Sequence, residues 1–455
     1  MTEQTLDLLE PLLGEVPDYD QFWTVDEQLV ELRALTEAHP DLCTLRRIGT
    51  SQLGEPLWCL RVEGGPRHAL CFGAPHPNEP IGCLSALHLA RTLCTDERLR
   101  TRLGLTWHLI PCADPDGMRL NEGWFEGPLT RTSFGRQFYR PAPSEQVEWT
   151  FPVAYKDLYF DRSLPETQAL MRLIDELRPT LLCPLHNSEL GGAYYYLSGP
   201  APDLYPALHD LARRCAIPLD LGEPEMPYIE PYAPAVFRMS SPEDAYEFAV
   251  RMGLDPLERA SGGSSTGYAA RWGTFSIVSE TPFWTHPDAA DQTVTSDPYG
   301  DVLRGRGAAL EELSRELVKT FGDVRADLVG GRPFALAVDE FGGSLGRTAA
   351  ADLRRAEEPR AQRPATVAER FSCADLINCF RLRYGGMLMR LLDGQLAIGN
   401  GTPAIRHHHQ RLAPLYERWC AEAEAATPAT PVPIRNTVAL QCGAMVAAAA
   451  HVVDG

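Results

Sequence analysis

Hydrophobic and polar positions follow two different periods in the first part of the chain. Residues 22–40 carry apolar side chains at helical spacing and end at a proline, which predicts a helix. Residues 42–49 and 56–64 have the patterns of strands and are joined by a Ser/Gly turn. The chain is therefore expected to open with a helix and a β-hairpin.

Further along, short apolar runs alternate with longer amphipathic segments. The apolar runs predict strands over 68–73, 103–112, 180–185 and 274–280, and the amphipathic segments predict helices over 81–95 and 165–177. Strands that alternate with helices are typical of α/β proteins. The expected fold class is α/β, with a mixed, mostly parallel central sheet flanked by helices.

The pattern changes in the later part of the chain. Residues 222–235 are rich in proline and tyrosine and predict a long surface loop, and helical periodicity returns at 367–395 and 403–425. We expect an N-terminal segment at 1–21, a main domain at 22–322 and a helical C-terminal extension at 323–455. The extension is a candidate cover for the functional site or a candidate homodimer contact.

Composition narrows the possible partners. The apolar fraction of 44% and the charged fraction of 23% are those of an ordinary globular protein. A formal net charge of −19 argues against a nucleic-acid partner and against docking on anionic membranes. The longest apolar run near the end, 443–453, is about half as long as a bilayer span.

The first residues and the cysteines bear on the cellular compartment. The N-terminal stretch is acidic and has neither a basic region nor an uninterrupted apolar run, so it does not resemble a signal peptide. The twelve cysteines are scattered, without a CxxC motif or a paired Cys/His array. We therefore expect reduced thiols, a cytoplasmic location and no structural zinc site.

The first candidate site is the turn APHPNEP, which follows the strand over 68–73. His76 and Glu79 lie three residues apart, so both side chains can face the same way, and imidazole with carboxylate suits zinc. Such a pair also arises by chance in helix caps. Its position strengthens it, because ligands of open α/β sheets gather beyond the carboxyl ends of strands.

Other polar residues follow strands in the same way. The turn PCADPDG, His186 and Glu280 all come at or after the ends of predicted strands. Catalytic zinc commonly has three protein ligands and leaves one position for water, and His186 is the best third ligand. The competing histidines are His88, His108 and His407 to His409 on regular elements, and His286, which is the one rival within reach.

Glu280 is the candidate general base. A carboxylate at the end of an apolar strand needs a partner or a function, and metal-assisted hydrolysis needs a carboxylate beside the attacking water. A structural salt bridge is the alternative interpretation.

Together these motifs resemble the zinc carboxypeptidase family. The matches are APHPNEP, ADPDG, LHNS and an SGGS loop in which Ser261 stands nineteen residues before Glu280. The resemblance covers roughly residues 22–320 and implies one zinc per chain, held by His76, Glu79 and His186. It also implies that Glu280 is catalytic and that the substrate is a peptide or small amide with a free carboxylate.

The sequence departs from the family at several positions. The family's tyrosine is replaced by Glu258, for which Tyr268 or a tyrosine of 222–235 is a candidate substitute, and Ser265 follows the SGGS motif. The family's Asn-Arg pair is absent between 117 and 160. The arginines available there are Arg119, Arg131, Arg136 and Arg140, and we favour Arg119 and Arg140 as carboxylate-binding residues because a guanidinium matches a carboxylate.

Three functions are compatible with the sequence. The leading interpretation is a zinc metallocarboxypeptidase that cleaves the C-terminal amide bond of a peptide or peptide-like metabolite. The first alternative is a zinc amidohydrolase that deacylates N-acyl amino acids, of the succinylglutamate desuccinylase and aspartoacylase type. The second is a binding protein without turnover, against which the retention of Glu280 argues.

Overall fold

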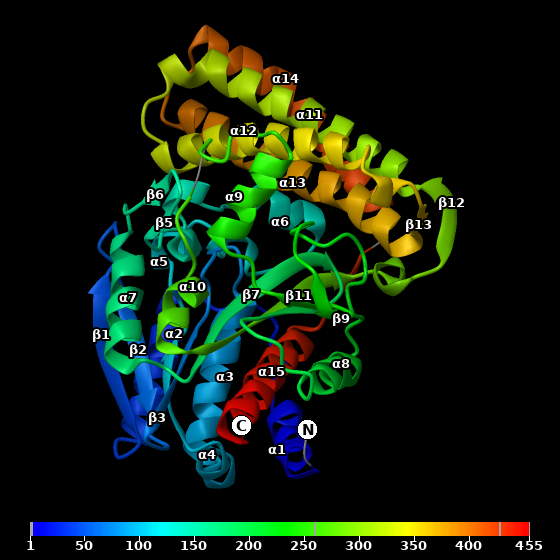
Figure 1. The fold of residues 1–455 in the computed structure, drawn as a ribbon. Coiled ribbons are helices and arrows are strands. Elements are labelled where there is room, and N and C mark those ends of the chain that lie inside the picture. The colour runs from blue at the N-terminus through cyan, green and yellow to red at the C-terminus, as the bar shows by residue number, and fades with distance from the viewer. Residues whose placement is uncertain (1–2, 259–260, 427–428, 455) are drawn as a thin grey trace.

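The computed structural model describes residues 3–258, 261–426 and 429–454. At its centre lies a ten-stranded mixed sheet in the order β1-β2-β4-β3-β7-β11-β8-β10-β9, with β14 paired to β11 (Figure 1). Strands β4, β3, β7 and β11 are parallel to one another, whereas β1, β2 and β8 pair in antiparallel fashion. The predicted fold class is confirmed.

The bounds of the elements are as follows. The sheet contains β1 (Cys43–Thr50), β2 (Pro56–Val62), β3 (Arg67–Phe72), β4 (Leu105–Ile110), β7 (Leu181–Gly191), β8 (Tyr194–Leu197), β9 (Pro231–Ala233), β10 (Val236–Arg238), β11 (Phe275–Thr285) and β14 (Thr430–Pro431). Two small pairs are β5 (Val153–Tyr155) with β6 (Leu158–Phe160) and β12 (Val294–Pro298) with β13 (Pro364–Thr366). The helices are α1 (Glu3–Gly14), α2 (Val25–Ala38), α3 (Ile81–Thr95), α4 (Glu97–Leu103), α5 (Pro115–Arg119), α6 (Arg131–Gln137), α7 (Pro165–Leu177), α8 (Tyr205–Arg214), α9 (Pro242–Arg251), α10 (Ser265–Ala269), α11 (Tyr299–Val324), α12 (Arg332–Arg355), α13 (Val367–Ala397), α14 (Pro403–Ala426) and α15 (Ile434–Asp454).

Both faces of the central sheet are buried, as the near-continuous apolar runs of its strands require. In β3, Ala69 and Cys71 belong to the core beneath α3 and α15, whereas Leu70 and Phe72 belong to the core beneath α7. This alternation follows from the period of two in a strand. The helices predicted over 81–95 and 165–177 form with these bounds as α3 and α7.

Two strands are longer than predicted. The sequence pattern ended strands at 185 and 280, but β7 continues to Gly191 and β11 to Thr285. His186 is therefore inside a strand rather than in a loop after it, and Glu280 is in the middle of a strand rather than at its end, which corrects both predictions. The extra residues remain extended because the two strands stay paired, with Ser188 opposite Pro282 and Gly191 opposite Thr285.

The late helices form two groups. Helices α11 to α14 pack on one another as a layer at the top of Figure 1, and α13 contacts α6 and β7. The predicted boundary at 322/323 falls near the end of α11, which packs on α12 beyond it. Helix α15 instead returns to the sheet and packs against α3 and β11.

Helix α15 is long and apolar enough, by length and composition, to cross a membrane. The sequence showed an apolar run only over 443–453, whereas the helix has 21 residues. Within the most apolar 18-residue stretch of the helix, 78% is buried in the protein. The fully buried Gln441 joins this helix to β7, β11 and α3. Its Nε2 donates to the carbonyls of His186 (2.7 Å) and Ser279 (3.3 Å), and its Oε1 accepts from the hydroxyl of Ser85 (2.7 Å). A helix that is buried to this extent is typical of a protein core.

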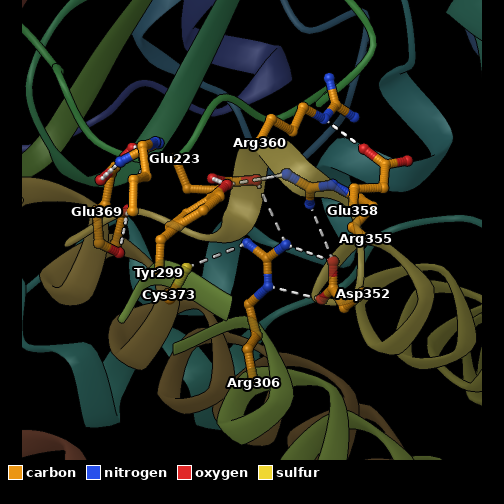
Figure 2. Close-up of polar contacts among 11 residues, drawn as sticks. Glu223, Tyr299, Arg306, Asp352, Arg355, Glu358, Arg360, Glu369 and Cys373 are labelled. Carbon is orange, nitrogen blue, oxygen red and sulfur yellow. Dashed lines mark hydrogen bonds and ion pairs between the residues drawn. The ribbon is translucent and has the colours of Figure 1, made fainter. Parts of the chain in front are cut away.

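The segment 222–235 is mostly irregular, as predicted, apart from the short strand β9. Its start is fixed to α11 and α12 by a buried charge network (Figure 2). Arg355 donates to Glu223 (2.6 Å) and Asp352 (3.1 Å), Arg306 donates to Asp352 (2.6 Å), and the Tyr299 hydroxyl also donates to Glu223. Two cations thus face two anions, the arrangement that makes burial of charge tolerable.

Candidate metal centre

The structure brings His76, Glu79 and His186 together. One ligand atom from each lies within 4.8 Å of the others, and all three residues are buried. His76 and Glu79 come from the turn between β3 and α3, where the Glu79 amide donates to the His76 carbonyl (3.0 Å), and His186 comes from β7. These are the three predicted ligands.

The turn before His76 is tightly packed. Gly73 leaves no room for a side chain, since a Cβ there would lie 2.5 Å from a backbone carbon of Gly82 and from the carbonyl of Pro111. Ala74 adopts a left-handed φ of 46°, which costs energy for a residue with a Cβ. On the other side Gly117, in the predicted PDG turn, packs against Pro77. The PDG turn therefore supports the ligand turn.

The donor atoms fit a zinc ion. The buried Nδ1 of His76 has no hydrogen-bond partner, and Nδ1 of His186 lies 3.0 Å from Oε2 of Glu79. Two imidazole nitrogens and one carboxylate oxygen are a ligand set typical of catalytic zinc. Burial is the largest cause of the low pKa of His76, so this imidazole stays neutral, as a ligand must be.

The charges around His186 favour a cation at the same place. Burial lowers the pKa of this imidazole, but hydrogen bonding and charge from Glu79, with the charges of Glu280 and Glu148, outweigh burial and raise the pKa to about 9. Three carboxylates therefore stabilise positive charge at the point where the ligand atoms meet.

Glu280 lies beside the ligands. It is opposite His186 in the parallel pair of β7 and β11, and its Oε1 is 4.0 Å from Nδ1 of His186. Burial, together with the charges of Glu79 and Glu225, raises the pKa of Glu280 to about 8 in spite of the opposing charge of His186. A carboxylate with such a pKa can accept and release a proton near neutral pH.

A further buried carboxylate, Glu148, was not predicted. It accepts hydrogen bonds from the amide (3.1 Å) and the hydroxyl (2.8 Å) of Ser265, and burial raises its pKa to about 7. The next residue, Trp149, meets the ring of His76 edge-on with centroids 5.1 Å apart. In the sequence, Glu148 is marked only by its two apolar neighbours in VEW, and this pattern is too common to indicate a functional residue.

The two predicted arginines lie in different surroundings. Arg140 donates to Oε1 of Glu79 (3.2 Å) and to Gln146 (3.1 Å), and its guanidinium lies over Trp149. Arg119 donates to Glu55 (2.6 Å) and Asp26 (2.9 Å) instead. The structure therefore brings Arg140, and not Arg119, to the ligands.

The residues that the sequence offered as an alternative metal ligand or as substitutes for the family's tyrosine make contacts elsewhere. His286 stacks on Phe371 with ring centroids 4.6 Å apart. Tyr268 donates to Asp175 on α7 (2.8 Å), and Tyr228, in the segment 222–235, is 3.3 Å from the hydroxyl of Ser240. The structure gives none of these described side chains a bond to a ligand residue.

Comparison with known proteins supports the resemblance to the zinc carboxypeptidase family. Residues 29–219 match the family model described as zinc carboxypeptidase, which confirms that resemblance. Carboxypeptidase E of Caenorhabditis elegans is 32% identical over 106 residues, which is 20% of this chain and 22% of that protein. The chain thus matches about a fifth of the length of this curated relative.

Solved structures also match the chain, at lower sequence identity. Carboxypeptidase A from Helicoverpa armigera is 17% identical, with 77% of this chain and 81% of that chain covered and a TM-score of 0.37. A metallo-carboxypeptidase from Burkholderia cenocepacia is 16% identical, with 57% and 60% covered and a TM-score of 0.36.

Proposed function

We propose that this chain, whose residues 29–219 match the zinc carboxypeptidase family, is a zinc-dependent hydrolase. Its substrate would be a peptide or peptide-like metabolite, which it cleaves at the C-terminal amide bond. The observation that carries the proposal is the meeting of His76, Glu79 and His186 within 4.8 Å, with Glu280 4.0 Å from His186.

The chain's own residues support this chemistry. His76, Glu79 and His186 would hold a zinc ion, and the bound ion would supply Lewis-acid chemistry toward a carbonyl and a water molecule. Glu280 accepts a proton from the attacking water at its carboxylate and returns it to the leaving amine. Its strand position beside His186 orients it for both transfers, and its burial keeps its pKa high enough to hold the proton between them.

Arg140 is the predicted substrate-binding residue with support from the structure. Its guanidinium lies next to the ligand residue Glu79, so a substrate carboxylate bound there would place the adjacent amide bond near the metal. Arg119 is bonded to Glu55 and Asp26, and it would have to leave both to bind substrate.

We further propose that the protein works in a reducing, cytoplasmic environment. All twelve cysteines are unpaired and eleven of them are buried. The sulfur atoms of Cys43 and Cys94 are 3.2 Å apart, well beyond the length of a disulfide bond of about 2.05 Å.

Zinc analysis and substrate profiling together test the proposed function. Purified protein should contain about one zinc per chain, and it should release single C-terminal residues from peptides. Equal cleavage of peptides with a free and an amidated C-terminus would exclude the carboxypeptidase function. Cleavage of N-acyl amino acids without cleavage of peptides would favour the deacylase alternative instead.

A further inference from the structure

Most arginines near the predicted carboxylate-binding region are already paired. Between 117 and 140, the arginines with acidic partners other than the metal ligands are Arg119 with Glu55 and Asp26, Arg131 with Asp375, and Arg136 with Glu417. Arg140 contacts the ligand residue Glu79, but a single guanidinium that also holds Gln146 offers few free donors. A second guanidinium nearby would complete a two-point receptor for a substrate carboxylate.

Helix α13, far away in the sequence, places a cation in this region. The Nε of Arg383 donates to Glu189 (2.5 Å), three residues after the ligand His186 in β7. Its guanidinium carbon lies 5.3 Å from the ring centroid of Phe138, two residues before Arg140. Arg383 thus lies between the two segments that carry His186 and Arg140.

The charges of both arginines act on the same neighbours. Burial is the largest cause of the lowered pKa of His76, and the charges of Arg140 and Arg383 lower this pKa further. Burial raises the pKa of the Tyr384 hydroxyl to about 12, and the same two charges oppose this rise. Both charges therefore act on His76, while the contacts of Arg383 with Glu189 and Phe138 place it against the segments that carry His186 and Arg140.

Both guanidiniums keep unused donors. Among the described residues, the Nη1 and Nη2 atoms of Arg383 and the Nη2 atom of Arg140 donate no hydrogen bond to the protein. The side chain of Arg383 is 12% exposed, so its terminal edge is not sealed in the core. Two parallel N–H groups on one edge match the two oxygens of a carboxylate.

We propose that Arg383, together with Arg140, binds the carboxylate of the substrate and makes the enzyme specific for a free C-terminus. This inference rests on the proposed function, because it assigns the residues that hold the anionic end of that substrate. It also gives the helical extension a role: α13 supplies a specificity-determining residue that the main domain lacks.

A binding measurement tests this without turnover. In the zinc-loaded Glu280→Gln protein, N-acetylated dipeptides with a free carboxylate and the same dipeptides as carboxamides are titrated by calorimetry. Adding Arg383→Gln should weaken binding of the acids about 10- to 100-fold, the range for loss of charge-assisted hydrogen bonds. Binding of the carboxamides should not change.

Arg381→Gln is the matched control. Arg381 lies on the same helix, two residues earlier, and pairs with Glu422 on α14 (3.4 Å). In the Glu280→Gln background this variant should bind acids and carboxamides as the background does. A loss of acid binding equal to that of Arg383→Gln would mean that α13 acts through its structure alone, and would overturn the inference.

A double variant separates substrate binding from neutralisation of Glu189. Glu189→Gln with Arg383→Gln removes both charges of the pair, and Arg131, which Glu189 also faces at 3.7 Å, keeps its closer partner Asp375 at 2.6 Å. The double variant should therefore recover part of the stability lost in Arg383→Gln, while acid binding stays weak. Recovery of acid binding in this double variant would show that Arg383 serves only Glu189. Normal acid binding by Arg383→Gln overturns this inference alone, whereas a Glu280→Gln protein that binds neither dipeptide series overturns the proposed function and the inference with it.

Discussion

Glu280 stands directly opposite His186 in the parallel pair of β7 and β11, with its Oε1 4.0 Å from Nδ1 of the imidazole. The pairing fixes the proposed general base and a proposed metal ligand on the same rigid sheet, so their spacing does not depend on a loop. Sites built on strands are held more accurately than sites on loops.

This relationship predicts the effect of Glu280→Gln. Glutamine keeps the size of the side chain but cannot accept the proton, so turnover should fall about 10²- to 10⁴-fold. Zinc content and melting temperature should stay close to those of the wild type, because Glu280 is not among the ligands. Normal activity per folded molecule, with a large loss of stability, would instead show a structural carboxylate.

Replacing either histidine of the candidate metal centre should remove the metal. His76→Ala and His186→Ala should each lower zinc content in elemental analysis, because three ligands are the usual minimum for a catalytic zinc site. His286→Ala is the control, since His286 stacks on Phe371 and should leave zinc content unchanged. Full zinc occupancy in His186→Ala would remove that residue from the site.

Glu148 predicts a pH dependence of stability in the metal-free protein. Burial raises its pKa from 4.5 to about 7, so between these values the folded protein binds a proton that the unfolded chain has lost. The free energy of unfolding should therefore fall as pH rises from about 4.5 to 7, by up to about 3 kcal/mol from this group. Denaturant unfolding at pH 5 and pH 8 should show a smaller fall in Glu148→Gln, and an identical fall would contradict this assignment.

The network of Figure 2 predicts a difference between buried and exposed ion pairs. Glu223→Gln leaves Arg355 and Arg306 with one anion between them and should cost about 3–5 kcal/mol of stability. Arg360→Ala, which breaks the exposed pair with Glu358, should cost less than about 1 kcal/mol. Urea unfolding of both variants measures this contrast, and similar losses would mean that the network is not the anchor of 222–235.

Local patterns were sufficient for much of the fold. Helix α7 could be predicted because it is buried on one side, which leaves a period in the sequence, whereas α3 is apolar enough to be buried almost all round. The proposed ligands His76, Glu79 and His186 could be singled out because each follows a predicted strand, and the structure brings them together. The ends of β7 and β11 could not, since strand length there depends on pairing between segments far apart in the chain.

The proposed substrate-binding arginines were harder to predict for a related reason. Arg119 and Arg140 both follow the Asp-Gly turn, and only the folded chain shows that acids already hold Arg119. Arg383 has no motif around it, and its proximity to the ligands arises from the packing of α13 against α6 and β7. Long-range packing of this kind leaves no local trace.

The hydrogen bonds of Gln441 can form only after the C-terminal helix α15 has been synthesised, although the strands that they join are made much earlier. Its amide donates to the backbone carbonyl of His186, a proposed metal ligand, and to that of Ser279, which precedes the proposed general base Glu280. These strands leave the ribosome well before α15 is made, and chains generally begin to fold from the N-terminal side during synthesis. Until α15 docks, the part of the sheet that this helix covers is exposed and apolar. A ribosome that stalls before residue 434 would therefore release an incomplete chain that is prone to aggregation.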